Sequence, residues 1–152
     1  MLVFSSLLGK LIFHFVISAT ATCCFAVLFN APGRVLLSAG VAGGLGWATF
    51  VWLRYSIFLS SINANLVAAV VIALAAEIFA RREKKPVTMY VVPALLVLVP
   101  GYSIFRAMNM FLNDHVPEGL AILLRAVTEA SAIAVGIVIV GIGAKVVKGR
   151  LR

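Results

Sequence analysis

Five long apolar stretches constrain this chain more than any other feature of its sequence. A helix needs about 20 apolar residues to cross the hydrocarbon core of a bilayer. The sequence offers five stretches of about that length, at 7–29, 35–53, 57–80, 87–110 and 119–144. Short connectors and a basic tail over 145–152 make up most of the rest. We therefore predict an all-α integral membrane protein, with five transmembrane helices in a single domain over 1–152.

The composition excludes a soluble protein. Hydrophobic residues make up 63% of the 152 residues and charged residues only 12%, whereas soluble domains average about 25% charged. A small soluble fold leaves much of its surface exposed, so it could not hide this much apolar side chain. The sequence also lacks a P-loop, the HExxH and GxSxG motifs and any cysteine–histidine metal spacing. We therefore expect neither an enzyme nor a nucleic-acid-binding protein, and no cofactor or metal.

Basic residues are distributed unevenly between the ends of the predicted helices, which sets the expected orientation. Lys and Arg accumulate in the cytoplasmic loops of membrane proteins. With five helices, the first and third loops share a side with the C-terminus, and that side carries nine basic residues: Arg34, Arg81, Arg82, Lys84, Lys85, Lys145, Lys148, Arg150 and Arg152. The other side carries about three, namely Lys10, Arg54 and Arg106. We therefore expect an outside N-terminus and a cytoplasmic C-terminus, with the first stretch retained as a helix rather than cleaved as a signal peptide.

Two charged residues fall inside the last apolar stretch, where each needs a physical explanation. Glu129 lies about ten residues into this stretch, which is about 15 Å along a helix and near the bilayer centre. Arg125 precedes it by four residues and therefore lies on the same face of the helix. The pair is either a local ion pair or a proton-titrating carboxylate with an arginine partner, and both interpretations stay open.

The fourth stretch contains Pro93 and the pair Pro100 and Gly101, which we expect to kink or interrupt its helix. Proline removes a helix hydrogen bond and clashes with the preceding turn. A second helix beginning after the break, in the run that includes Ser103, would present its N-terminal N–H groups to an anionic group. Arg106 would add a fixed positive charge. The alternative is an ordinary proline kink with Arg106 extending to the outer interface.

Other polar residues within the apolar stretches also have more than one interpretation. Asn63 and Asn65 suit hydrogen bonds between helices, with substrate contact as the alternative. Glu77 precedes Arg81 by about one helical turn, which favours a local ion pair at the interface. His14 suits packing or a hydrogen bond better than a proton relay.

Glycines in the second stretch predict close packing between helices. Gly40 and Gly44 form a small-xxx-small pattern, which lets two helices approach closely. Gly136, Gly141 and Gly143 form a similar patch in the last stretch. This pattern is common in membrane helices, so it predicts packing without specifying a partner.

Three sequence motifs carry a resemblance to a known family. They are FNAPGR at 29–34, AEIFARR at 76–82 with a proline following, and VP at 92–93 with VPGYSIFRAM at 99–108. Outside the VPGYSIFRAM run, the residues that carry the pattern are Asn30, Pro32, Arg34, Glu77, Arg81, Pro86 and Pro93. In this order and spacing the motifs resemble the threonine/serine exporter family. The chain looks most like its small five-helix subunit, which corresponds to the C-terminal membrane half of the fused exporters.

The resemblance implies a proton-driven secondary exporter of the bacterial inner membrane. Fused members export threonine and serine, and a split two-protein version is associated with export of succinate, a dicarboxylate. The small subunit of a split system works with a larger membrane subunit, so we expect that partner or, alternatively, a homo-oligomer. Two rival interpretations remain, a channel formed by copies of this chain and a membrane scaffold that transports nothing. The candidate residues of the substrate or proton pathway are Pro100, Gly101, Ser103, Arg106, Arg125, Glu129, Asn63 and Asn65.

Overall fold

Helices make up nearly all of the described chain. The computed structural model describes the backbone of residues 2–150 and the side chains of residues 7–146. The helices in this range are α1 (Leu2–Leu28), α2 (Gly33–Ser56), α3 (Ser61–Glu83), α4 (Thr88–Leu95), α5 (Gly101–Leu112) and α6 (Val116–Arg150). The prediction of an all-helical protein is therefore confirmed for the described residues.

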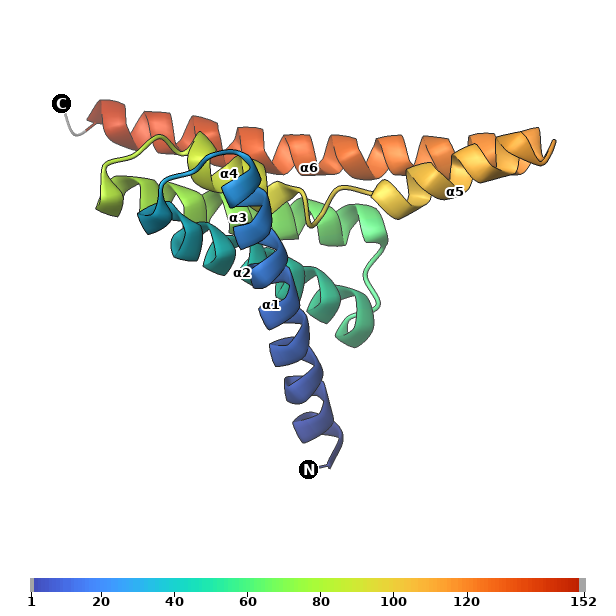
Figure 1. Ribbon diagram of the computed structural model, residues 1–152, viewed down its shortest axis with the longest axis horizontal. Coiled ribbons are helices and arrows are strands. Elements are labelled where there is room, and N and C mark those ends of the chain that lie inside the picture. The colour runs from blue at the N-terminus through green and yellow to red at the C-terminus, as the bar shows by residue number, and fades with distance from the viewer. Residues whose placement is uncertain (1, 151–152) are drawn as a thin grey trace.

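Three long helices, α2, α3 and α6, lie side by side and form the body of the bundle (Figure 1). Helix α3 packs against both α2 and α6. The short helix α4 packs against α2 and α3, whereas α5 packs against α6. Helix α1 packs mainly on α2 and crosses the bundle obliquely, so that its N-terminal part extends away from the other helices (Figure 1).

Four helices in the described part of the chain are long and apolar enough to cross a membrane. They cover Leu7–Leu28, Gly33–Ser56, Ser61–Glu83 and Val116–Val146. These ranges overlap four of the five predicted stretches, which confirms four long apolar helices as candidate membrane spans. The number of crossings beyond these four, and the orientation, stay predictions.

The fifth predicted stretch, 87–110, is divided between two short helices. Residues 96–100 separate α4 from α5, and Pro100 occupies the position just before the first residue of α5. At about 1.5 Å per residue, helices of 8 and 12 residues are about 12 and 18 Å long, so neither crosses the core of a bilayer alone. The predicted interruption at Pro100 and Gly101 is therefore a full break, since Pro100 has no N–H for a helical hydrogen bond and stands just before the first residue of α5. Pro93, in contrast, lies inside α4 and does not interrupt it.

Glycines allow the long helices to approach closely. A Cβ atom on Gly43 would lie 2.0 Å from Thr22 Oγ1 of α1, and one on Gly46 would lie 2.2 Å from Ile72 Cγ1 of α3. Gly40 and Gly44 also face α1, where added Cβ atoms would meet Cys23 and Phe15. The predicted packing role of Gly40 and Gly44 is therefore confirmed, and the partner helix is α1.

The half-buried carboxylate of Glu83 joins three helices at one end of the bundle. Ser38 Oγ of α2 donates to Glu83 Oε1 of α3, and the Tyr90 hydroxyl of α4 donates to Glu83 Oε2 at 2.8 Å. Tyr90 is fully buried. None of these residues stood out in the sequence, because Ser38 lies 45 residues from Glu83 and a turn separates Glu83 from Tyr90.

The charge asymmetry of the sequence corresponds to the two ends of this bundle. One end holds the connection between α1 and α2, the connection between α3 and α4, and the C-terminal end of α6 (Figure 1). Its basic residues include Arg34, Arg81, Lys84, Lys85 and Lys145. The opposite end holds the α2–α3 and α5–α6 connections (Figure 1). By the positive-inside rule the first of these is the predicted cytoplasmic end.

Candidate functional site

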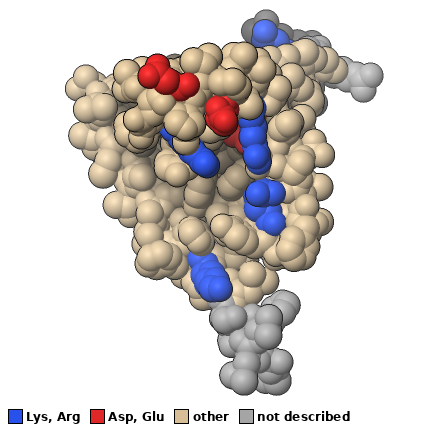
Figure 2. Space-filling view, turned by 90° about the vertical axis from the view of Figure 1, so that its right-hand side faces the viewer, with Lys and Arg blue, Asp and Glu red and all other residues tan. Residues whose placement is uncertain are grey.

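A cavity of about 410 Å³ lies beside the break between α4 and α5. It is formed by the linker and by residues of α2, α3, α5 and α6. Figure 2 shows the molecule from the end where α5 joins α6, and Lys and Arg side chains gather there around a hollow, with acidic side chains beside them. The polar and loop-forming residues that line the cavity are Arg54, Ser61, Asn65, Pro100, Gly101, Tyr102, Ser103, Arg106, Arg125 and Glu129.

The break presents the start of α5 to this cavity. The first helical hydrogen bond of α5 joins Ile104 N–H to the Pro100 carbonyl at 3.1 Å. The N–H groups of Tyr102 and Ser103 precede that bond, so they belong to the first turn, whose N–H groups have no partner within the helix. A helix N-terminus carries a partial positive charge and favours an anion. The backbone here therefore adds to the positive character of the cavity.

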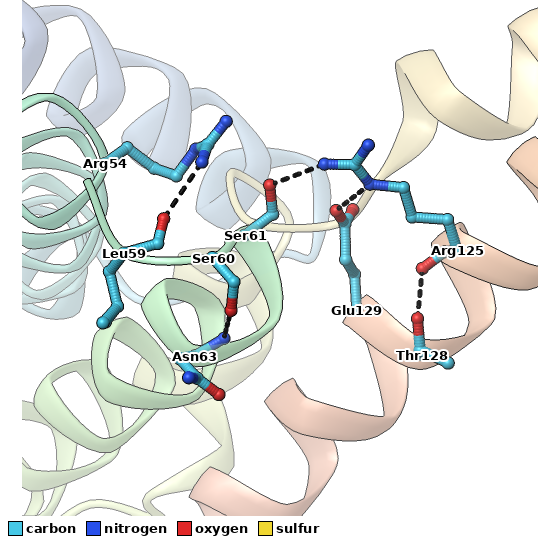
Figure 3. A network of polar contacts seen from close by, with 8 residues as sticks. All are labelled: Arg54, Leu59, Ser60, Ser61, Asn63, Arg125, Thr128 and Glu129. Carbon is cyan, nitrogen blue, oxygen red and sulfur yellow. Dashed lines mark hydrogen bonds and ion pairs between the residues drawn. The ribbon is translucent and has the colours of Figure 1, made fainter.

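Arg125 and Glu129 form an ion pair within α6, and Arg125 also bonds to α3 (Figure 3). Arg125 Nε lies 3.4 Å from Glu129 Oε1, and Arg125 Nη2 donates to Ser61 Oγ at 3.1 Å. The Arg125 side chain is 63% exposed, whereas that of Glu129 is 10% exposed. The predicted pairing is confirmed, and it places a largely buried carboxylate in the wall of the cavity. Whether Glu129 also carries protons stays a prediction.

Arg54 enters the cavity from the end of α2. Its Nη1 donates to the Leu59 carbonyl at 3.0 Å, across the connection between α2 and α3. Figure 3 shows Arg54 and Arg125 on either side of the start of α3, where Ser60 Oγ accepts the Asn63 N–H. Two guanidinium groups therefore approach the same site from two different helices.

The cavity carries an excess of positive charge. Three arginines, Arg54, Arg106 and Arg125, face one carboxylate, Glu129, which leaves a formal charge of three minus one, or +2. Arg106 is exposed and makes no hydrogen bond or ion pair with another described residue. Asn65 is only 4% exposed, and its side-chain amide makes no hydrogen bond to another described residue. These two side chains can therefore bind a ligand without giving up an internal partner.

Seven of the eight predicted pathway residues meet at this cavity, and Asn63 does not. The seven are Pro100, Gly101, Ser103, Arg106, Arg125, Glu129 and Asn65. Asn63 is exposed and does not line the cavity. Two residues along a helix differ by about 200° in direction, so Asn63 and Asn65 of α3 point to opposite sides.

Several residues of the cavity wall were not predicted from the sequence. Arg54 entered only the charge count at the helix ends, and Ser61 and Phe50 carried no signal of their own. Trp47 stacks on Phe50 with ring centroids 5.2 Å apart, and its Nε1 donates to His14 Nδ1 of α1 at 3.4 Å. The predicted hydrogen-bonding role of His14 is therefore confirmed. No local pattern could have found this wall, because it depends on how α2 and α3 pack against α5 and α6.

The motif residues at the opposite end shape the connections between helices. Asn30 adopts a positive φ of 55°, and the following Ala31 N–H bonds back to the Ala26 carbonyl at 2.9 Å, which ends α1. Pro32 then precedes the first residue of α2. Glu77 and Arg81 form the predicted ion pair, with Nε 3.3 Å from Oε2. These residues lie away from the cavity at the break.

The arrangement defines a class of protein, which is a helical membrane protein with a charged cavity at a broken helix. Transporters build substrate sites in this way, from interrupted helices whose freed backbone groups face the ligand. The family model described as "Threonine/Serine exporter, ThrE" matches residues 14–142. The chain therefore belongs to the threonine/serine exporter family, a family of transporters rather than enzymes.

Two curated relatives are consistent with this membership. The chain is 28% identical over 123 residues to a probable threonine/serine exporter of Mycobacterium tuberculosis. The aligned region covers 80% of this chain and 23% of that protein. It is 29% identical over 115 residues to a threonine/serine exporter of Corynebacterium glutamicum, and this aligned region covers 76% of this chain and 23% of that protein. The chain thus spans about a quarter of the length of these relatives. No solved structure matched it.

Proposed function

We propose that this chain is a membrane subunit of a secondary-active exporter in the bacterial inner membrane, which moves threonine and serine or a small dicarboxylate such as succinate out of the cell. The observation that carries the proposal is the cavity at the α4–α5 break, lined by three arginines and one carboxylate. Family membership supports the transport of threonine and serine. The charge of the cavity supports a substrate that carries at least one carboxylate.

The substrate carboxylate binds at the start of α5 in this proposal. The first-turn N–H groups near Ser103 and the guanidinium of Arg106 supply hydrogen bonds and positive charge to it. An amino acid would also offer an ammonium group, for which Glu129 is the one carboxylate of the cavity wall within the described residues. A dicarboxylate would instead place its second carboxylate against Arg54 or Arg125.

Glu129 is the proposed proton carrier. It is the carboxylate that lines the cavity, its side chain is 10% exposed, and its partner Arg125 also bonds to Ser61 at the start of α3. Protonation would remove its charge and weaken its pairing with Arg125. For an amino acid, protonation would also remove the charge that faces the ammonium group, so proton and substrate would compete for one site, as the exchange of an entering proton for a leaving solute requires.

A larger membrane subunit of the same family is the proposed partner, with a homo-oligomer as the alternative. The curated relatives are about four times as long as the segment they share with this chain. Arg125 has a 63% exposed side chain although it lies in an apolar helix. Because charged side chains in lipid are costly, a second chain or water must cover this face of the cavity.

The test is efflux from cells preloaded with labelled threonine, serine or succinate. Cells that express this chain alone are compared with cells that also express a larger family member, and membrane insertion of both chains is checked by immunoblot. Efflux only with both chains supports the two-subunit exporter, and the fastest solute gives the substrate class. Gradient-following efflux from this chain alone, without proton dependence, would instead indicate a channel. No efflux of any of the three solutes with both chains inserted would contradict the proposal and favour a scaffold.

A further inference from the structure

A second cavity, of about 670 Å³, lies at the opposite end of the bundle between the C-terminal ends of α3 and α6. We call it the basic pocket, because the charged residues that line it are Glu77, Arg81, Lys84, Lys85 and Lys145. Four of these side chains are basic, and the single acidic one, Glu77, already pairs with Arg81 at 3.3 Å. The formal charge of the pocket is therefore four minus one, or +3.

The chain fold holds the two adjacent lysines at this position. Lys84 ends α3 in a left-handed conformation with φ of 52°, and Lys85 N–H then bonds to the Ala80 carbonyl at 3.1 Å. This reversal turns the chain back over the end of α3, so both lysines line the pocket from a short, hydrogen-bonded turn. Both side chains are exposed, and neither forms an ion pair with another described residue.

An apolar groove of about 480 Å³ continues from the basic pocket along α3 and α6. The two cavities share Glu77, Arg81 and Ala144. The other lining residues of the groove are all apolar: Val70, Leu74, Ile78, Ile139, Val140 and Gly143. Open space lies beside Gly143, because a Cβ atom placed there would meet nothing within 4 Å. The result is one continuous surface, strongly basic at its end and apolar along its length.

We propose that this surface binds an anionic phospholipid, with the phosphate headgroup in the basic pocket and an acyl chain in the apolar groove. Each half of the surface matches one half of that molecule. A soluble phosphate would use only the basic pocket, and an uncharged lipid would use only the groove. The pocket also lies at the predicted cytoplasmic end, where basic residues between helices meet the lipid headgroups.

The test is native mass spectrometry of the full chain in detergent, with its larger subunit where that is needed for stability. The probes are phosphatidylglycerol, phosphatidylcholine with the same acyl chains, and glycerol phosphate. We expect phosphatidylglycerol to bind at least tenfold more tightly than phosphatidylcholine, and glycerol phosphate to bind far more weakly than either lipid. Equal binding of the two lipids would overturn the proposal, and tight binding of glycerol phosphate would indicate a site for a soluble phosphate instead.

Two sets of variants separate the headgroup contact from the chain contact. The triple variant Lys84→Gln, Lys85→Gln, Lys145→Gln should lose the preference for phosphatidylglycerol. The affinity for this lipid should fall about fivefold for each lysine replaced. The same three positions changed to Arg should keep it. Arg82→Gln is the control, because Arg82 is exposed but does not line the pocket. An unchanged preference in the triple Gln variant would overturn the headgroup assignment.

Glycine variants test the groove. Gly143→Phe should fill the groove and lower the binding affinity for both lipids about tenfold, whereas Gly141→Phe should have little effect on either affinity. Both glycines have open space around the position of a Cβ atom, but only Gly143 lines the groove. Equal effects of the two substitutions would overturn the assignment of the acyl chain.

Discussion

Arg106 offers the most informative single substitution in the cavity. Its side chain is exposed and makes no polar contact with another described residue, whereas Arg54 bonds to the Leu59 carbonyl and Arg125 bonds to both Glu129 and Ser61. Arg106→Gln should therefore leave the fold intact, because it removes no internal hydrogen bond. Its effect should fall on the bound carboxylate alone.

The size of that effect follows from the hydrogen bond between the guanidinium and the substrate carboxylate. A hydrogen bond to a charged group contributes about 1.5–3 kcal/mol net, which corresponds to roughly a 10- to 100-fold change in affinity. We therefore expect Arg106→Gln to raise the half-saturating substrate concentration for efflux by roughly that factor. Arg106→Lys should give a smaller change, because it keeps the charge but loses the planar pair of donors.

The assay is the initial rate of efflux of labelled threonine, serine or succinate from preloaded proteoliposomes, measured as a function of internal concentration. Arg82→Gln is a matched control, since it also removes one exposed arginine but lies outside the cavity. Thermal unfolding in detergent checks that each variant is folded. A half-saturating concentration unchanged from the parent chain, in a folded Arg106→Gln variant, would refute the assignment of Arg106 to the substrate.

Three further predictions follow from the same geometry. Glu129→Gln should make efflux insensitive to an imposed pH gradient, and a variant that keeps the full response of the parent chain would contradict the role of Glu129 as proton carrier. Gly46→Ala should destabilise the α2–α3 contact by about 1–3 kcal/mol, because its Cβ would lie 2.2 Å from Ile72 Cγ1 and ordinary contacts begin near 3.4 Å. Adding Ile72→Ala should remove that clash, so the melting temperature of the double variant should exceed the additive expectation from the two single changes. Asn65→Ala should lower the rate of efflux several-fold while Asn63→Ala leaves it within twofold, and equal losses would contradict the placement of Asn65 alone in the cavity.

The features that the sequence could predict were those set by neighbouring residues. The Arg125–Glu129 pair follows from a spacing of four on one helix, and the structure has it at 3.4 Å. The break at Pro100 and Gly101 follows from the chemistry of proline, and α5 begins at Gly101. The Glu77–Arg81 pair follows from the same helical spacing.

The features that escaped the sequence analysis depend on how distant segments pack. Arg54 reaches the cavity only because α2 and α3 form a hairpin, which brings its guanidinium next to the start of α3. Ser38, Glu83 and Tyr90 meet because α2, α3 and α4 converge at one end. No spacing rule links these positions. Asn63 was predicted to share the pathway with Asn65, but the two residues face opposite sides of α3. The helical period would have excluded one of them from the cavity once the position of the other was known.

The central claim is that the cavity at the α4–α5 break is the substrate site, and cysteine labelling at Ser103 tests it most directly. Ser103→Cys is made in a chain whose own cysteines are replaced, Cys23→Ala and Cys24→Ala. It is compared with His115→Cys, which is exposed in the connection between α5 and α6 and lies outside the cavity. The rate of labelling by a membrane-impermeant thiol reagent is measured with and without threonine, serine or succinate. The account predicts that both variants are labelled and that a transported solute slows the labelling of Ser103→Cys several-fold, while the labelling of His115→Cys does not change. Labelling of Ser103→Cys that none of the three solutes changes would contradict the claim.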